Sequence, residues 1–145
     1  LYIFGGYDGQ TNHNEIHEFD CETLQWRVIP TTGEKLKGRN GQTATHVDGL
    51  LFVIGGWLGA GPLAASDLYV LDLKRLHWVK PRTHGSLPGA CNMHTADYVE
   101  KRHQIFVFRG GREVGPRGWQ VRTRGQKVTF PRFDPVVLHF LAEIP

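Results

Sequence analysis

Residues 51–56 read Leu-Phe-Val-Ile-Gly-Gly, and this apolar run closed by two glycines occurs three times in the chain. The other copies are residues 1–6 and residues 105–111, the latter with Arg109 interposed before the glycines. Four-residue runs rich in β-branched and aromatic side chains predict short buried strands. A glycine pair supplies the positive φ, or the close backbone approach, where the chain leaves each strand. The three pairs are Gly5-Gly6, Gly55-Gly56 and Gly110-Gly111.

The segments between the glycine pairs repeat as well. Residues 15–20 and 67–72 lie 52 positions apart, and the same offset aligns Trp26 with Trp78 over a register of some eighty residues. The glycine pairs are 50 and then 55 residues apart. The first unit turns at Asp48-Gly49, a two-residue hairpin. The equivalent turn of the next unit, at residues 100–103, is longer, and this insertion accounts for the difference in spacing. The sequence therefore contains an internal repeat.

Further short strands are predicted within each unit, and no segment of residues 1–108 shows a sustained helical period. Four short strands in about 52 residues make one blade of a β-propeller. The expected strands after each apolar run are Ile16–Phe19 and Leu68–Leu71, then Gln25–Ile29 and His77–Val79, then Gln42–Val47 and His94–Val99.

The unit around the second glycine pair resembles the kelch repeat: residues 51–56 are followed by Tyr69 and then by Trp78. Arg39 matches the arginine that the family places near the start of the innermost strand, whereas its counterpart in the next unit is Cys91. The resemblance implies an all-β fold, a partial kelch-type β-propeller of four-stranded antiparallel blades. Trp26 and Trp78 are expected to fill the gaps between neighbouring blades.

The repeats cover residues 1–111, divided into a blade part at 1–32, a blade at 33–84 and a blade start at 85–111. The expected remaining blades would come from a longer parent chain, because an open stack leaves sheet faces and edges uncovered. Residues 112–145 form a divergent tail, a long loop in which Val136–Leu141 could be a delayed further strand.

Charge is concentrated in that tail. The net charge of the chain is +3. Residues 1–108 have a net charge of −1, whereas residues 109–132 have a net charge of +6. The tail lacks a nucleic-acid-binding motif, so a solvated loop is preferred, with binding to nucleic acid or an anionic surface as an alternative. Cys21 and Cys91 form no disulfide framework, which favours the cytoplasm or the nucleus. No apolar run approaches the ~20 residues of a membrane span.

No constellation of residues indicates catalysis. None of the eight histidines lies in an HExxH motif or at metal-ligand spacing. Asp20 and Asp72 recur at equivalent positions, which favours turn capping over catalysis. Cys91 has no base recognisable beside it. We therefore expect a protein that is not an enzyme and holds no cofactor or metal. The alternative is a galactose-oxidase-like enzyme fragment, which would hold copper through tyrosines and histidines.

The loops after the glycine pairs differ between units, which suits recognition of a protein partner by a rigid scaffold. The kelch resemblance implies a non-catalytic interaction module, such as the substrate-recognition part of a ubiquitin-ligase adaptor or a cytoskeletal binder. Aromatic and arginine side chains favour partner contacts, although the aromatic rings could instead pack beneath their own loops. The predicted partner-binding residues are Tyr7, Asp8, Trp57, Leu58, Arg109 and Arg112.

Overall fold

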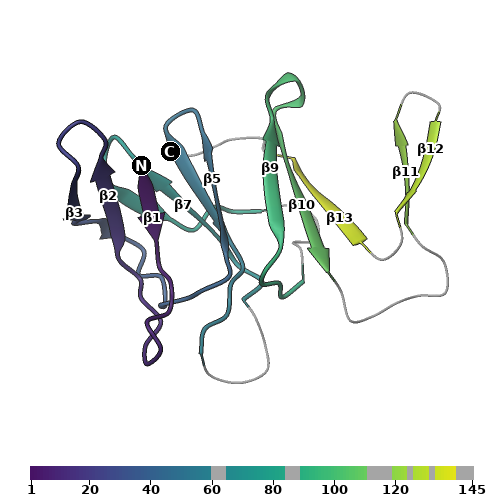
Figure 1. The fold of residues 1–145 in the computed structure, drawn as a ribbon. Coiled ribbons are helices and arrows are strands. Elements are labelled where there is room, and N and C mark those ends of the chain that lie inside the picture. Colours follow the sequence, from purple (N-terminus) through teal and green to yellow (C-terminus); the bar gives the residue numbers. More distant parts are fainter. Residues whose placement is uncertain (60–64, 84–88, 111–118, 124–125, 131–132, 140–145) are drawn as a thin grey trace.

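The computed structural model describes the chain except for residues 60–64, 84–88, 111–118, 124–125, 131–132 and 140–145 (Figure 1). The described residues form strands, turns and one 3-10 turn at Glu100–Arg102, and none of them lies in an α-helix. None of the described residues forms a helix of the length and apolar character that a membrane crossing requires. The predicted all-β class is therefore confirmed.

Three successive sheets follow one another across Figure 1. We call the first sheet blade 1. It is antiparallel and contains β1 (Tyr2–Phe4), β2 (Ile16–Asp20) and β3 (Gln25–Ile29).

Blade 2 is a five-stranded sheet. Its strands β5 to β8 pair antiparallel in chain order, and β4 lies parallel to β8 on the outer edge. The bounds are β4 (Thr32–Gly33), β5 (Thr43–Val47), β6 (Leu50–Ile54), β7 (Leu68–Asp72) and β8 (His77–Val79). Because β4 directly follows blade 1 in the chain, its pairing with β8 ties blade 1 to blade 2.

Blade 3 contains β9 (Thr95–Val99), β10 (Gln104–Gly110) and β13 (Phe133–His139), with β10 in the middle. β13 pairs with β10 on the edge that β7 occupies on β6 in blade 2. Residues 136–139 of the segment in which a delayed strand was expected therefore lie in β13, and residues 140 and 141 lie outside the described residues. β11 (Trp119–Thr123) and β12 (Gln126–Phe130) pair as a separate hairpin in the intervening sequence.

The turns follow the predicted chemistry. Asp48 and Gly49 both have positive φ, 48° and 81°, as a two-residue type I′ hairpin requires. At the outer turns, Asp20 Oδ1 accepts hydrogen bonds from two backbone N–H groups two and three residues later, at 2.8 and 3.1 Å. Asp72 does the same at 2.9 Å each. These repeated aspartates cap turns, as predicted.

The glycine pairs mark close contacts between blades. Gly55 and Gly56 have φ of 64° and 98°. A Cβ on Gly55 would clash with the Cys91 carbonyl oxygen, and the Gly56 N–H donates to that oxygen at 2.8 Å. Gly55-Gly56 therefore lets the linker that enters blade 3 cross close to blade 2.

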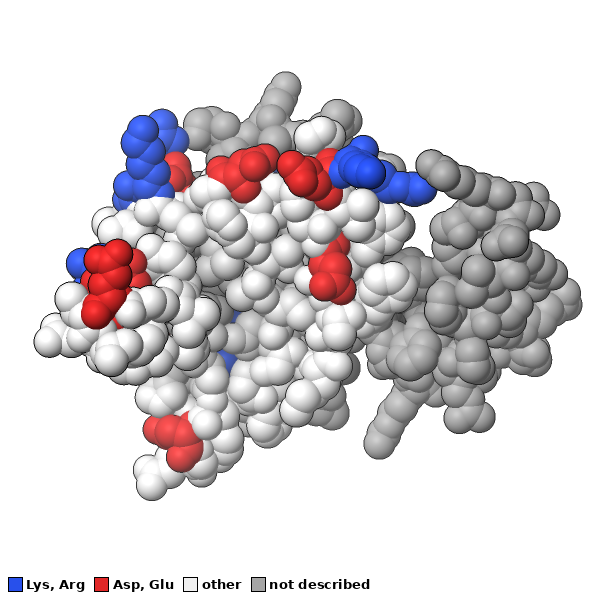
Figure 2. Space-filling model, turned by 45° about the horizontal axis from the view of Figure 1, so that its top comes forward, with Lys and Arg blue, Asp and Glu red and all other residues white. Residues whose placement is uncertain are grey.

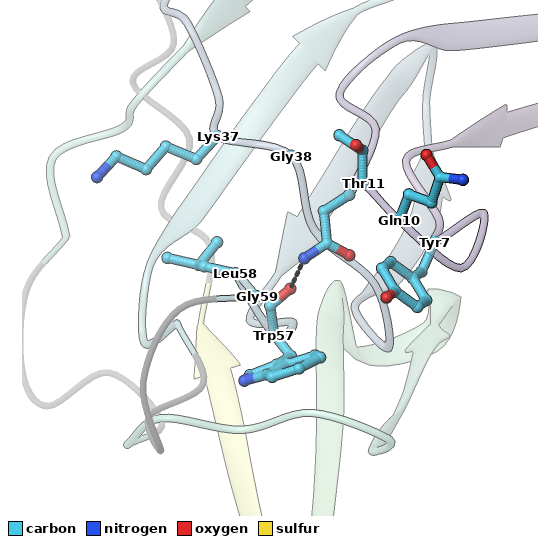
Figure 3. A pocket seen from close by; sticks show the side chains of 9 residues that line it. Tyr7, Gln10, Thr11, Lys37, Gly38, Trp57, Leu58 and Gly59 are labelled. Carbon is cyan, nitrogen blue, oxygen red and sulfur yellow. Dashed lines mark hydrogen bonds between the residues drawn. The ribbon is translucent and has the colours of Figure 1, made fainter.

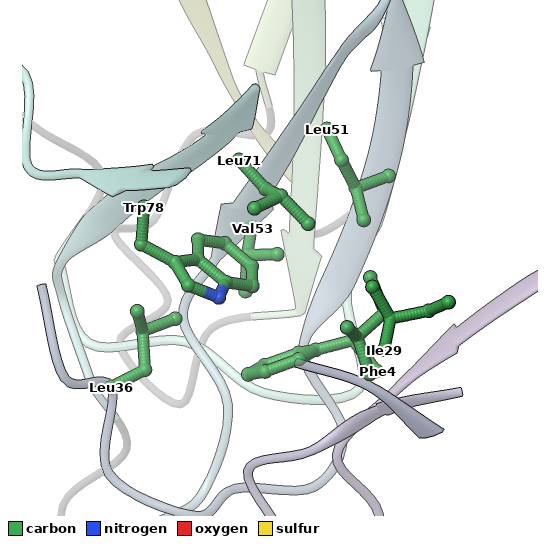
Figure 4. Packing of buried hydrophobic residues seen from close by; sticks show 8 residues of the cluster. Phe4, Ile29, Leu36, Leu51, Val53, Leu71 and Trp78 are labelled. Carbon is green, nitrogen blue, oxygen red and sulfur yellow. The ribbon is translucent and has the colours of Figure 1, made fainter. Parts of the chain in front are cut away.

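Two hydrophobic cores lie between the sheets, one on each face of blade 2. In the first core Trp78 is only 3% exposed, and its ring packs on Phe4 of blade 1 with centroids 5.1 Å apart (Figure 4). The remaining buried members are Ile16, Ile29, Leu36, Leu51, Val53 and Leu71. The second core joins blades 2 and 3 through Phe52, Ile54, Leu68, Val70, Cys91, Ile105 and Val107.

The expectation that Trp26 fills a gap between blades is wrong for this structure. Trp26 is 52% exposed and is stacked on Phe19 of its own sheet, with ring centroids 4.8 Å apart. Trp78 points toward the sheet that precedes it, and Trp26 occupies the equivalent place in the first sheet. No described sheet covers that face, so the ring stays in contact with solvent.

Arg39 is the largest fully buried side chain, 1% exposed. It lies in the linker before β5 and donates to Asp67 Oδ1 at 2.6 Å and to the Gly55 carbonyl oxygen at 2.9 Å. Its guanidinium also lies over the Tyr69 ring at 5.5 Å. This buried charge is therefore both paired and hydrogen-bonded, as a charge removed from water requires.

Cys91, the counterpart of Arg39, has a histidine beside it that the sequence analysis missed. Cys91 Sγ lies 3.8 Å from His94 Nε2, and both residues are buried. Burial lowers the pKa of His94, which favours the neutral imidazole. The pair is therefore part of the packing between blades 2 and 3.

Candidate partner-binding face

Three loops meet where blades 1 and 2 adjoin. They are the loop after the first glycine pair (residues 7–14), the start of the loop after the second pair (57–59), and the linker 37–40 between the blades. Isolated antiparallel bridges join Tyr7 to Asn12 within the first loop and Asn40 to Trp57 between the linker and the second loop.

The first loop is fixed by an aspartate turn. Asp8 Oδ1 accepts hydrogen bonds from the backbone N–H groups of Gln10 and Thr11, both at 2.7 Å. Asp8 Oδ2 contacts His13 Nε2 at 2.9 Å. The N–H bonds from Thr11 and Gln10, followed by the contact with His13, lower the pKa of Asp8 to about 2. Asp8 is therefore ionised at neutral pH and holds the loop shape.

Asn12 connects the first loop to the other two. Its Nδ2 donates to the Trp57 carbonyl oxygen at 3.4 Å, and its Oδ1 accepts from Asn40 Nδ2 at 2.6 Å. Gly38 is needed here because a Cβ at this position would clash with the Asn12 carbonyl oxygen. A Cβ on Gly59 would lie 2.7 Å from Asn12 Nδ2. The three loops are therefore held together by contacts with Asn12 and form one surface.

These loops enclose a hollow of about 350 Å³ (Figure 3). Tyr7 is 54% exposed and its hydroxyl donates to the Gly9 carbonyl oxygen at 2.7 Å, while Trp57 is half-buried. The Lys37 side chain extends away from the two rings in Figure 3. The lining residues are Tyr7, Gln10, Thr11, Asn12, Lys37, Gly38, Trp57, Leu58 and Gly59.

The structure brings together part of the predicted residue set. Tyr7, Trp57 and Leu58 line the same hollow, although they come from different blades. Asp8 is adjacent, but its carboxylate is used inside the loop. Arg109 is a residue of β10, and its backbone lies opposite that of Asp134 in the register with β13. Arg112 lies outside the described residues, as does Gly111.

The residues that join the loops were not predicted. Asn12, Lys37 and Gly38 have no identical counterpart 52 positions later, Asn40 recurs as Asn92, and the meeting of all four depends on how two blades adjoin. The one signal was the position of Gly38 and Asn40 on either side of Arg39, the residue that matches the family's buried arginine.

Charges are mixed on the face drawn in Figure 2. Both acidic and basic side chains are seen on it, mostly near its margin, and most of the described surface between them is uncharged. Among the described residues, no group of three or more histidine, cysteine, aspartate or glutamate side chains is arranged to hold a metal ion. What the hollow offers is aromatic surface with amide and hydroxyl groups.

Sheets that pack face to face, with Trp78 buried between two of them and the buried Arg39 before the innermost strand, define part of a kelch-type β-propeller. The family model of the KLHDC2/KLHL20/DRC7 Kelch-repeats domain matches residues 1–120. The chain belongs to the kelch-repeat family.

Three relatives illustrate the range of kelch proteins that the chain resembles. It is 32% identical over 112 residues to the Rab9 effector protein with kelch motifs of Bos taurus, and 30% identical over 119 residues to the human Kelch domain-containing protein 3. Each match covers 76% of this chain. It is also 30% identical over 93 residues, 61% of the chain, to the Rho GTPase-activating protein gacHH of Dictyostelium discoideum. The chain spans 30%, 31% and 6% of the lengths of these relatives, respectively.

Proposed function

We propose that the chain is a non-catalytic protein-interaction module whose partner inserts a side chain or a short peptide segment into the hollow between blades 1 and 2. The observation that carries this proposal is the convergence of Tyr7 and Trp57 from two different blades onto one hollow. Tyrosine and tryptophan dominate binding energy at protein interfaces because they bury large apolar areas with few rotatable bonds.

Two features of the loops support the proposal. Asp8, Asn12 and Gly38 hold the loops in place, so little conformational entropy is lost when a partner binds. The wall also offers the amide group of Gln10, which can pair with a peptide backbone. Among the relatives, one is named an effector of Rab9, and its name therefore describes a protein that acts through a protein partner.

The identity of the partner is a narrower question. The substrate-recognition part of a ubiquitin-ligase adaptor and a cytoskeletal binder are both roles that the family resemblance implies. We propose that in either role the partner would bind at the same loop surface, in the hollow lined by Tyr7 and Trp57.

The test is selection of binding peptides from a random displayed library with the full chain as bait. The selected peptides are then measured against Tyr7→Ala and Trp57→Ala variants. Each truncation should weaken binding by roughly tenfold or more, because truncation of an interface hot spot costs about 2 kcal/mol or more.

Trp26→Ala is the matched control, since it removes an exposed aromatic side chain from a different face of blade 1. Binding to this control variant should be unchanged. Selected peptides that bind Tyr7→Ala and Trp57→Ala as tightly as the original chain would contradict the proposal, and so would peptides that depend on Trp26.

A further inference from the structure

Met93 is the most exposed of the large apolar side chains among the described residues. It lies in the linker that joins blade 2 to β9 of blade 3, and it is 83% exposed. It is also the sole methionine of the chain. Apolar burial stabilises a fold in proportion to the area removed from water, so a side chain with this exposure adds little to the packing of the blades.

The backbone of Met93 has a conformation that glycine adopts more readily. Its φ is 53°, in the left-handed region, where the Cβ of an L-residue crowds the backbone. The residue 52 positions earlier in the repeat is Gly41, whose φ is 67°. Both linkers therefore need the left-handed conformation, but only the earlier one places a glycine there. The methionine side chain at this position costs backbone strain that glycine would avoid.

The other described residues that have positive φ and are not glycine have local reasons for it. Asp48 and His103 lie in the turns that join β5 to β6 and β9 to β10. Leu24 and Leu76 share one repeat position in the outer turns, and Leu76 packs against the first core. Met93 lies in a linker and belongs to neither core of the described residues. Strain without a local packing reason indicates that the side chain itself has a function.

Backbone contacts connect Met93 to the hollow between blades 1 and 2. The Met93 N–H donates to the Gly41 carbonyl oxygen at 2.7 Å. Gly41 follows Asn40, whose backbone exchanges two hydrogen bonds with the backbone of Trp57, at 3.1 and 2.7 Å. Trp57 lines the hollow. Two successive linkers therefore form a continuous path from the hollow to the exposed methionine.

We propose that Met93 is a partner-contact residue: the polypeptide segment that enters the hollow continues over the linker of blade 3 and places a large apolar side chain on Met93. This inference rests on the proposed function and adds a second requirement for the partner, an apolar residue beyond the one that enters the hollow. The unbranched, polarizable thioether suits this role because it adapts to aliphatic and aromatic side chains alike.

Met93→Gly separates a role in binding from a role in folding. Glycine removes both the side chain and the left-handed strain, so the melting temperature of the variant should equal or exceed that of the original chain. Binding of displayed peptides that depend on Tyr7 and Trp57 should weaken by roughly tenfold, as expected when a contact that buries a methionine side chain is lost. Replacement of the peptide's second apolar residue by serine should weaken binding to the original chain and should abolish the difference between the two proteins.

Leu24→Gly is the matched control. Leu24 is also an exposed apolar residue with positive φ, 57°, but it lies in the outer turn of blade 1. This variant should bind the peptides as tightly as the original chain. A melting temperature of Met93→Gly that falls below that of Leu24→Gly would assign Met93 to packing and would overturn the inference.

The methyl group of Met93 gives a direct readout. A chain labelled with ¹³C at the methionine methyl shows one signal once any starting methionine is removed, and a bound peptide should shift it. Peptides that need Tyr7 and Trp57 but leave this signal in place and bind Met93→Gly equally well would overturn the inference while the proposed function stands. Peptides that need neither Tyr7 nor Trp57 would overturn both. A signal that shifts with the concentration of the chain alone would also overturn the inference, because a second copy would then cover Met93.

Discussion

Blades 1 and 2 each have a tryptophan at the same repeat position, but the two side chains differ in burial. Trp26 and Trp78 both lie on the outermost antiparallel strand of a blade, 52 residues apart. Trp78 is buried against Phe4 of the preceding sheet, whereas Trp26 stacks on Phe19 of its own sheet and remains half exposed. The repeat therefore specifies a face that can be buried, and the neighbouring sheet decides whether it is buried.

The largest expected effect is that of Trp78→Ala. Removal of the indole leaves a cavity among Phe4, Leu36 and Val53 that two sheets cannot close. Truncation of a buried aromatic side chain costs about 3–5 kcal/mol. The measurement is the free energy of unfolding in urea, with an unchanged m-value as the check that the same structure unfolds. A loss below about 1 kcal/mol would contradict the packing between blades 1 and 2.

Arg39→Met extends the comparison to the buried linkers. The substitution removes the guanidinium that pairs with Asp67 and bonds the Gly55 carbonyl oxygen, so a half-buried carboxylate loses its partner. The expected loss is roughly 3 kcal/mol, at the lower end for a broken buried pair because Asp67 keeps contact with solvent. The Arg39→Met, Asp67→Leu double variant should recover part of this loss. If the double variant recovers none of the lost stability, the unpaired Asp67 carboxylate is not the cause of the loss.

Trp26→Ala should have a much smaller effect than its counterpart in blade 2. The exposed ring loses chiefly its stacking on Phe19, and such aromatic pairs are worth about 0.5–1.5 kcal/mol. Urea unfolding of this variant beside Trp78→Ala provides the measurement. Equal losses for the two variants would contradict the comparison between the blades.

The smallest expected effect concerns His94, the counterpart of Gln42 at the start of the next inner strand. Because burial lowers the pKa of His94 below its ordinary value of 6.5, the unfolded chain binds this proton more readily than the folded chain. Stability is therefore complete above about pH 6.5 and declines as the pH falls below it. His94→Gln should remove this part of the decline, seen as a flatter dependence of the melting temperature on pH between 7 and 5. An identical pH dependence in both proteins would contradict the assignment.

Much of the fold could be predicted because each apolar run and each glycine pair carries a local signal. The strands around residues 51–54 and 68–71 are found within a residue or two of their predicted bounds. β4 was not predicted, because two residues carry no periodic pattern and their partners in β8 lie 45 residues further along the chain. The exposure of Trp26 could not be predicted for a related reason: sequence identity at a repeat position does not report which sheets are adjacent.

The candidate site divides in the same way. Tyr7 and Trp57 could be singled out as aromatic residues in loops that differ between units. Their meeting at one hollow depends on Asn12 and Gly38, whose contacts exist only when two blades pack together. Local sequence therefore indicates the two aromatic residues, and the arrangement of the blades determines the surface that they form.

The central claim is that neighbouring blades stabilise each other through their facing side chains. A double-mutant cycle between Phe4 and Trp78, with each replaced by leucine singly and together, measures this contact across the two sheets most directly. The expected coupling free energy is at least about 0.5 kcal/mol, as found for aromatic pairs in contact. Strictly additive losses, with no coupling, would contradict it.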